Sequence, residues 1–175
     1  NGAPLGIRGT NIDVTDKQLA LNQIRKLLQA VEQSQASIVI TNLAGDIEYV
    51  NPFFCKMTGY TKEEAKGKNP RILSTGHTSK AAYAEMFEKL QKGETWQGEF
   101  LNRKKNGELY WEFATISPIK NEQGEIENYV AIKEDITERK KLSESLKSSE
   151  LKYRLIAENT SDVIWVYNFS RQRFT

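Results

Sequence analysis

Apolar and polar positions along the middle of the chain predict consecutive β-strands. Two apolar runs, 109–119 and 126–136, are rich in aromatic and β-branched residues and are separated by a polar turn that ends at Gly124. A similar run at 95–103 precedes them, and its turn contains Asn106-Gly107, a pair that tolerates positive φ. Three strands joined by short turns predict an antiparallel meander.

The remainder of the chain alternates short strands with helical periodicity. Strands are expected at 37–41 and 46–50, and short helices are expected to begin at Asn51-Pro52 and at Thr61. Residues 67–77 are expected to form a loop. Longer helices are expected at 16–33, 78–92 and 138–157, where apolar residues recur every three or four positions. Strands at both ends with helices between them predict an α+β domain built on one sheet.

Composition narrows the function classes. The chain has 175 residues, of which 38% are hydrophobic and 27% charged, with a net charge of +2. That charge is too small to argue for a nucleic-acid or membrane surface, and no apolar run approaches the ~20 residues of a membrane span. A single cysteine excludes an intrachain disulfide framework and favours a reducing, cytoplasmic location, although a longer parent protein could be anchored elsewhere.

Two pairs of similar segments indicate a repeat. Residues 2–15 are similar to 124–137, and residues 30–42 are similar to 156–168. The chain is therefore expected to hold one complete module between two partial ones. The expected division is 1–15 as the last strand of a preceding module, 16–32 as a linker helix, 33–137 as the complete module, 138–157 as a second, coiled-coil-like linker helix, and 158–175 as the start of a following module.

Three phrases in the complete module carry a family resemblance: YVNPFFCKMTGY at 49–60, GKNPRILS at 67–74, and WQGEFLNRKKNGELYWEFATISPI at 96–119. Together with the closing EDIT at 134–137, they resemble PAS sensory domains. The resemblance implies a PAS fold, a five-stranded antiparallel sheet with short helices on one face that enclose a pocket. It also implies a sensory module rather than an enzyme.

The loop 67–74 resembles the photoreactive loop of the light–oxygen–voltage branch of this family. On that resemblance, Asn69, Arg71 and Asn102 match residues that hold a flavin. Pro70 replaces the reactive cysteine, so the light-driven thiol adduct is excluded.

Two further flavin-facing positions depart from the light–oxygen–voltage pattern. Glu112 replaces the second asparagine and Lys133 replaces the final glutamine. An alternative interpretation is a cross-strand ion pair, worth well under ~1 kcal/mol if exposed.

Another branch of the family binds FAD without the cysteine, and its loop and Trp-x-Gly strand are similar to residues 69–79 and 96–98. This resemblance implies a flavin under Trp96, and FAD is the candidate cofactor. The candidate cofactor-binding residues are Asn69, Arg71, Trp96, Asn102, Trp111, Glu112 and Lys133. The alternatives are that the two tryptophans are core aromatics, that Asn69 only satisfies the loop backbone, and that the pocket is empty or holds a small metabolite.

Other chemistry is poorly supported. His77 is interpreted as a surface loop residue, and Cys55 as a buried, inert thiol. One histidine and one distant cysteine do not predict a metal site. Haem is disfavoured because the helix after the loop carries Ala81, Ala82 and Tyr83 where haem-binding relatives place an axial histidine.

The linker helices predict the output mechanism. Each carries a narrow apolar seam that favours a parallel coiled coil between two copies of the chain: Leu21, Ile24, Leu28 and Val31 in the first, and Leu142, Leu146, Ser149, Tyr153 and Ile156 in the second. The alternative is a helix lying back on its own sheet. Asp135 and Thr137, with Asp13 and Thr15 at the corresponding positions of the first repeat, are the candidate signal-relay residues.

Two function classes follow. The first is a ligand- or redox-sensing input module beside neighbouring PAS modules, with a histidine kinase or cyclic-dinucleotide enzyme as the output domain. The second is a ligand-free PAS repeat that serves dimerisation and strain relay only. The incomplete ends add one expectation: Leu5–Ile12 or Val163–Tyr167 should pair with a sheet edge of another copy or of the central domain.

Overall fold

The computed structural model describes residues 14–159, 167–168 and 173–174. The chain divides into two compact units, Asn1–Glu134 and Asp135–Thr175, which are described separately. Within the described ranges, no helix combines the length and the apolar character needed to cross a membrane.

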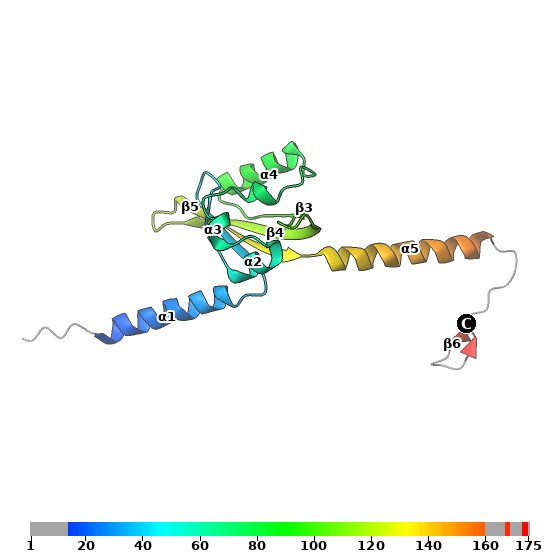
Figure 1. Cartoon of the computed structure of the whole chain (residues 1–175), viewed down its shortest axis with the longest axis horizontal. Helices are drawn as coiled ribbons and strands as arrows, with labels where there is room; N and C mark the ends of the chain where they lie inside the picture. The colour runs from blue at the N-terminus through cyan, green and yellow to red at the C-terminus, as the bar shows by residue number, and fades with distance from the viewer. Residues whose placement is uncertain (1–13, 160–166, 169–172, 175) are drawn as a thin grey trace, which may run out of the picture. The chain divides into compact units, whose positions relative to one another are not determined.

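The first unit contains a five-stranded sheet (Figure 1). Its strands are β1 (Ser37–Thr41), β2 (Ile47–Val50), β3 (Trp96–Arg103), β4 (Leu109–Lys120) and β5 (Ile126–Asp135). Their order is β2-β1-β5-β4-β3, so the first and last strands are neighbours, with Ile38 opposite Ile132. The predicted α+β architecture and antiparallel meander are confirmed.

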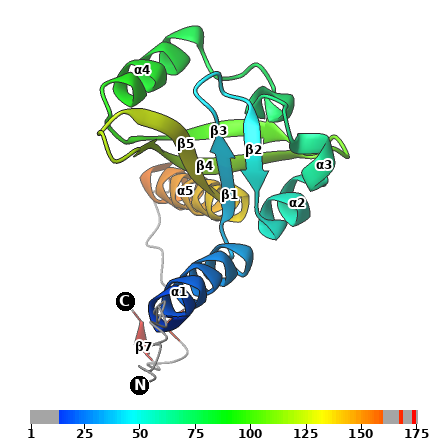
Figure 2. The same ribbon diagram turned by 90° about the vertical axis from the view of Figure 1, so that its left-hand side faces the viewer.

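Short helices cover one face of this sheet (Figure 2). They are α2 (Pro52–Thr58), α3 (Lys62–Ala65), the 3₁₀ turn η1 (Pro70–Leu73) and α4 (Lys80–Gln91). Thr61 and Glu64 form the predicted capping box at the start of α3. The segment 67–77, predicted as a loop, contains η1 because Asn69 caps that turn and Pro70 occupies its first position.

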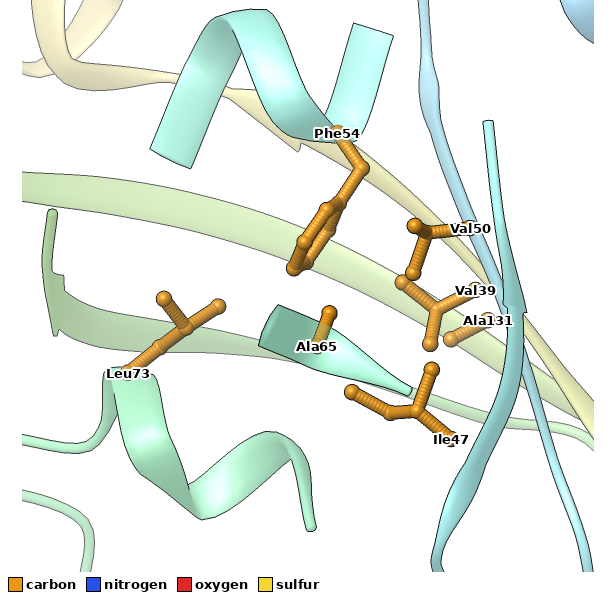
Figure 3. Packing of buried hydrophobic residues seen from close by; sticks show 7 residues of the cluster. All are labelled: Val39, Ile47, Val50, Phe54, Ala65, Leu73 and Ala131. Atoms are coloured by element: carbon orange, nitrogen blue, oxygen red, sulfur yellow. The ribbon is translucent and has the colours of Figure 1, made fainter. Parts of the chain in front are cut away.

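Two apolar clusters hold the helices to the sheet. The first joins α2, α3 and η1 to β1, β2 and β5, and consists of Val39, Ile47, Val50, Phe54, Ala65, Leu73 and Ala131 (Figure 3). The second joins α4 to β3 and β4, and consists of Met86, Leu90, Trp96, Phe100 and Ala114. Ile116 packs against both clusters.

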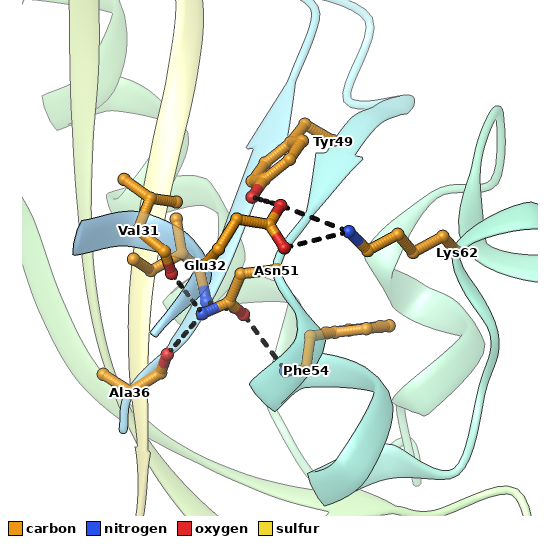
Figure 4. Close-up of polar contacts among 8 residues, drawn as sticks. Val31, Glu32, Ala36, Tyr49, Asn51, Phe54 and Lys62 are labelled. Carbon is orange, nitrogen blue, oxygen red and sulfur yellow. Dashed lines mark hydrogen bonds and ion pairs between the residues drawn. The ribbon is translucent and has the colours of Figure 1, made fainter. Parts of the chain in front are cut away.

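The side chain of Asn51 joins the first helix to the sheet and to α2 through hydrogen bonds (Figure 4). It is fully buried, and its side-chain oxygen accepts from the backbone of Ile38 and Phe54. Its side-chain nitrogen donates to the carbonyls of Val31 and Ala36. One amide therefore connects the end of the first helix to β1, β2 and α2.

The first helix, α1 (Val14–Glu32), is anchored at its last residue. The carboxylate of Glu32 accepts from the Tyr49 hydroxyl at 2.7 Å and pairs with Lys62 at 3.2 Å. Burial, together with the bond to Glu32, raises the pKa of Tyr49 to about 12. The helix was predicted to begin at Asp16, but Val14 and Thr15 are already helical, so they do not belong to the predicted strand.

The second unit contains α5 (Thr137–Asn159). This helix begins one residue before and ends two residues after the predicted range, 138–157. Its seam residues are strongly exposed in the described chain, with Leu142, Leu146 and Tyr153 at 70%, 63% and 72%.

Part of the edge-pairing prediction falls outside the described residues, namely Leu5–Ile12 and positions 163–166. Asp13 also lies outside them. Tyr167 belongs to β6 (Tyr167–Asn168), which pairs with β7 (Arg173–Phe174) of the same chain. The pairing of Tyr167 with another copy or with the central domain stays a prediction, because β7 occupies one edge of β6 only.

Candidate functional site

A cavity lies where the two apolar clusters meet, between α4 and the helix-covered face of the sheet. Its volume is about 120 Å³. The apolar part of its wall consists of residues from both clusters, among them Val39 and Ala131 of the first and Met86 and Phe100 of the second. Exposed residues also border the cavity, among them Leu43, Arg71 and Phe87, which places its mouth at the β1–β2 turn, η1 and α4.

A buried ion pair forms part of the cavity wall. The Lys133 ammonium lies 2.7 Å from a carboxylate oxygen of Glu112, and their side chains are only 7% and 0% exposed. The hydroxyl of Tyr110 donates to the other Glu112 oxygen at 3.1 Å. The predicted cross-strand pair is therefore present, but the energy expected for an exposed pair does not apply to it, since removing one partner would leave a buried charge.

Strand alternation brings these groups together. Along β4, Tyr110, Glu112 and Ala114 point to the helix-covered face, and along β5, Ala131 and Lys133 do the same. Because β4 and β5 are neighbours, the carboxylate and the ammonium meet across the centre of the sheet.

Asn102 supplies a second polar group to the cavity. Its side chain is 7% exposed, and none of the described residues forms a hydrogen bond with its amide. Its backbone pairs with Tyr110 on one side and forms a bridge with Ser74 on the other. The amide is thus held in a buried position and offers a donor and an acceptor to the cavity.

The loop residues are used differently. The Asn69 amide donates to the Gly45 carbonyl at 3.1 Å and accepts from the Arg71 backbone at 3.1 Å, which is the loop-satisfying role considered as an alternative. Arg71 is exposed, and its guanidinium lies 5.8 Å from the centre of the Tyr83 ring. Both residues line the cavity, Arg71 at its mouth.

The two tryptophans are absent from the cavity lining. Trp96 is 7% exposed in the second cluster, 5.2 Å from the Phe100 ring centre, and lies over Gly98, where an added Cβ would come within 2.3 Å of the indole. Trp111 is half-buried and meets the exposed His77 edge-on at 5.9 Å. Trp96 is therefore a core aromatic, and its ring explains the glycine two positions later.

Cys55 and the histidine give no sign of chemistry. Cys55 is half-buried rather than buried as expected; it packs against the first cluster, and burial raises the pKa of its thiol. Among the described residues, no group of three or more His, Cys, Asp or Glu side chains is arranged to hold a metal ion.

The relay residues stand at the start of the second unit. The Asp135 carboxylate accepts from the backbone N–H of Thr137 at 2.9 Å, so it satisfies one of the free donors at the start of α5. Thr15 lies in the first turn of α1.

Comparison with known proteins identifies the family. The PAS domain family model matches residues 35–138, which include all five sheet strands and every cavity residue. The chain belongs to the PAS domain family. The curated relatives include the nitrogen fixation regulatory protein of Klebsiella oxytoca, 36% identical over 118 residues. That match covers 67% of this chain but only 24% of the relative, so the chain spans about a quarter of that relative's length.

Solved PAS structures confirm the fold. The PAS domain of a protein from Colwellia psychrerythraea has a TM-score of 0.62 at 25% identity, covering 66% of this chain and 98% of that one. A light–oxygen–voltage domain studied with a flavin analogue has a TM-score of 0.59 at 27% identity, covering 73% and 96%.

The cavity is smaller than a flavin ring system requires, although it is open at its mouth. A cavity of about 150 Å³ accommodates one benzene ring, so a three-ring isoalloxazine would need roughly three times that volume. The cavity holds about 120 Å³, and the Asn69 amide is already bonded to the backbone. No step of the proposed mechanism is therefore assigned to a flavin.

Several cavity residues escaped sequence reasoning. The cavity lining includes four residues that the sequence did not mark as site residues: Thr41, Met86, Phe100 and Tyr129. Alternation along β5 contained the signal for Tyr129, because it stands two and four positions before Ala131 and Lys133. The hydroxyl of Tyr110 could not have been assigned to Glu112 without the twist and packing of β4.

The ion pair generates a stability prediction. Glu112→Gln and Lys133→Met should each lower the free energy of unfolding by about 3–5 kcal/mol, because each leaves one buried charge unpaired. The double variant should recover most of that loss. Urea denaturation of the four proteins gives the double-mutant cycle. Two losses that simply add in the double variant would contradict the pairing.

Proposed function

We propose that this PAS domain is the sensory input module of a larger signalling protein. It binds a small molecule in the cavity and passes a conformational change through α5 to an output domain outside this chain, such as a histidine kinase or a cyclic-dinucleotide enzyme. The similarity to a nitrogen fixation regulatory protein, of which the chain spans about a quarter, supports a regulatory role within a larger protein.

The observation that carries the proposal is the polar part of the cavity wall. Beside the Glu112–Lys133 pair, the Asn102 side chain lines a cavity of about 120 Å³, and its amide has no hydrogen-bond partner in the described chain. Because this amide faces the cavity and has no partner in the described chain, a bound molecule with complementary donors and acceptors could form hydrogen bonds with it without displacing a protein contact. A domain that serves only as a spacer gains nothing from this arrangement.

The path to the output runs along β5. Ala131 and Lys133 face the cavity, and β5 ends only one residue before α5 begins. A ligand that engages Lys133 would therefore act on the strand that continues into the helix. Asp135, which caps the start of α5, is the residue that would convert strand displacement into helix reorientation.

A second copy of the chain is the proposed partner of α5. Its exposed seam residues follow heptad spacing, a pattern that favours a parallel coiled coil. The seam of α1 is also exposed, with Leu21, Ile24 and Leu28 at 55%, 54% and 56%. Paired helices on both sides of the domain would transmit a change in register or tilt. The further expectation of a tandem array of modules is part of the same proposal.

The alternative function is a ligand-free repeat that dimerises and relays strain. The exposed seams of both linker helices support this alternative as well as the sensor. The two functions differ in whether the cavity holds a molecule in solution.

The purified chain should carry a small molecule and should lack a visible flavin band. Extraction under denaturing conditions followed by mass spectrometry should detect the molecule, or a metabolite panel should raise the melting temperature. Ala131→Leu should abolish the effect because it fills the cavity. The matched control is Ile132→Leu, which changes the next residue of β5, on its exposed face, and should leave ligand binding unchanged. An empty extract and no stabilising metabolite would favour the ligand-free repeat.

Leu146→Lys should weaken self-association at least tenfold, because two like charges would meet in the coiled-coil seam. Ser148→Lys adds the same charge at an exposed position of the same helix and should leave association unchanged. Sedimentation equilibrium measures both. If the parent chain is a monomer at its highest soluble concentration, or if the two variants behave alike, the paired-helix part of the proposal is wrong.

A further inference from the structure

The charges in the cavity wall balance within the wall itself. Glu112 and Lys133 are joined at 2.7 Å, and both are buried, so together they contribute no net charge. The remaining cation of the lining, Arg71, is exposed and lies over Tyr83 at the mouth. In the described lining, no buried cation is therefore left to neutralise an incoming anion, nor a buried carboxylate for an incoming cation.

A charged ligand would consequently disturb the pair. A carboxylate placed beside Lys133 would also lie near Glu112, and one of the two negative charges would remain buried and uncompensated. A neutral group avoids this penalty, because it can accept a hydrogen bond from the ammonium without altering the balance. The Lys133 ammonium has three donors, and its described partner is Glu112 alone.

The Asn102 amide defines the shape of the polar contact. It lines the same cavity as the ion pair, has no partner among the described residues, and presents both a carbonyl acceptor and N–H donors. A ligand that both donates and accepts along one edge would satisfy it. A primary amide or a lactam has this pair of groups, whereas an ether, a hydrocarbon or a carboxylate lacks one or both.

Volume sets the size of the ligand. About 120 Å³ is slightly less than the ~150 Å³ that accommodates one benzene ring, so the cavity suits a single ring. The wall beside the polar groups is aromatic and aliphatic, with Phe100, Tyr129 and Met86. Aromatic side chains favour a flat ring against them.

From these observations we infer that the cavity selects an uncharged, single-ring ligand whose edge carries an amide or lactam, and that it rejects carboxylates of the same shape. The inference rests on the proposed ligand-binding function and narrows it to one chemical class. The ion pair excludes the charged isostere, Asn102 reads the amide edge, and the cavity volume excludes fused rings.

Three probes of nearly equal shape test the inference. Benzamide is neutral and carries the amide edge, benzoate is its charged isostere, and toluene has the ring without polar groups. Titration of the whole chain, followed by amide chemical shifts and by calorimetry, should show saturable binding of benzamide. Benzoate and toluene should bind at least about tenfold more weakly, since neither can satisfy Asn102 and Lys133 together.

Two variants separate recognition from stability. Asn102→Leu is similar in volume and should weaken benzamide binding at least about tenfold while leaving toluene binding unchanged or stronger. Gln97→Leu removes a polar group from an exposed position of the same strand and should leave benzamide binding unchanged. The amide spectrum of each variant confirms that the fold is retained.

Each remaining outcome has a definite meaning. Equal or tighter binding of benzoate would overturn the charge argument, and unchanged benzamide binding by Asn102→Leu would overturn the role of the amide. Stoichiometric flavin binding would overturn the size argument. Failure of all three probes would refute the inference as a whole. In each case the proposed sensory function survives if a molecule is extracted from the purified chain, and it fails only if none is found and no metabolite stabilises the domain.

Discussion

The ion pair between Glu112 and Lys133 is the constraint from which the rest of the site follows. It lies between neighbouring central strands, where burial separates both charges from bulk water, so each group depends on the other. The Tyr110 hydroxyl completes the arrangement by donating to the free carboxylate oxygen. Because the pair is neutral as a unit, it makes part of the cavity wall polar without making it charged. The same pair links the ligand site to β5 and hence to the start of α5.

Periodicity was sufficient to predict the strands and helices, whereas their order in the sheet came from the resemblance to PAS domains. The strands at 109–120 and 126–135 combine β-branched and aromatic residues with clear turn signals, and short helices were marked by Asn51-Pro52 and by the capping box at Thr61. The 3₁₀ turn at Pro70 was missed, since four residues are too few to show a period. The first helix was placed two residues late, because Val14 and Thr15 precede the segment that shows the apolar period.

The site was less predictable, and the reason is geometric. The resemblance to flavin-binding relatives singled out Asn69, Asn102, Glu112 and Lys133, and all four line the cavity. It could not show which of them are already bonded within the protein. Asn69 is bonded to backbone on both sides of its amide, whereas Asn102 has no described partner. Trp96 was expected beside a ligand, yet it lies in the core over Gly98. These distinctions depend on contacts between distant segments, which a one-dimensional pattern does not contain.

Asn51 shows how the cavity domain and the first linker helix are coupled. Its four hydrogen bonds connect α1 to the strand and helix that carry the first apolar cluster, and Glu32 adds a second contact through Tyr49. The domain thus has a hydrogen-bonded junction on its N-terminal side and a one-residue junction between β5 and α5. A signal that enters at the cavity has a short covalent route to α5 through Lys133, and β1, whose Val39 also lines the cavity, leads back toward α1.

The most direct test of the account is to observe the Lys133 ammonium itself by NMR in a chain labelled with ¹⁵N-lysine. Assigned by its loss in Lys133→Met, this signal should exchange slowly with water and should shift when benzamide is added, while the exposed lysines of α1 and α5 remain unchanged. If the Lys133 ammonium exchanges as fast as those exposed lysines and does not respond to benzamide, the buried pair does not control the site as described.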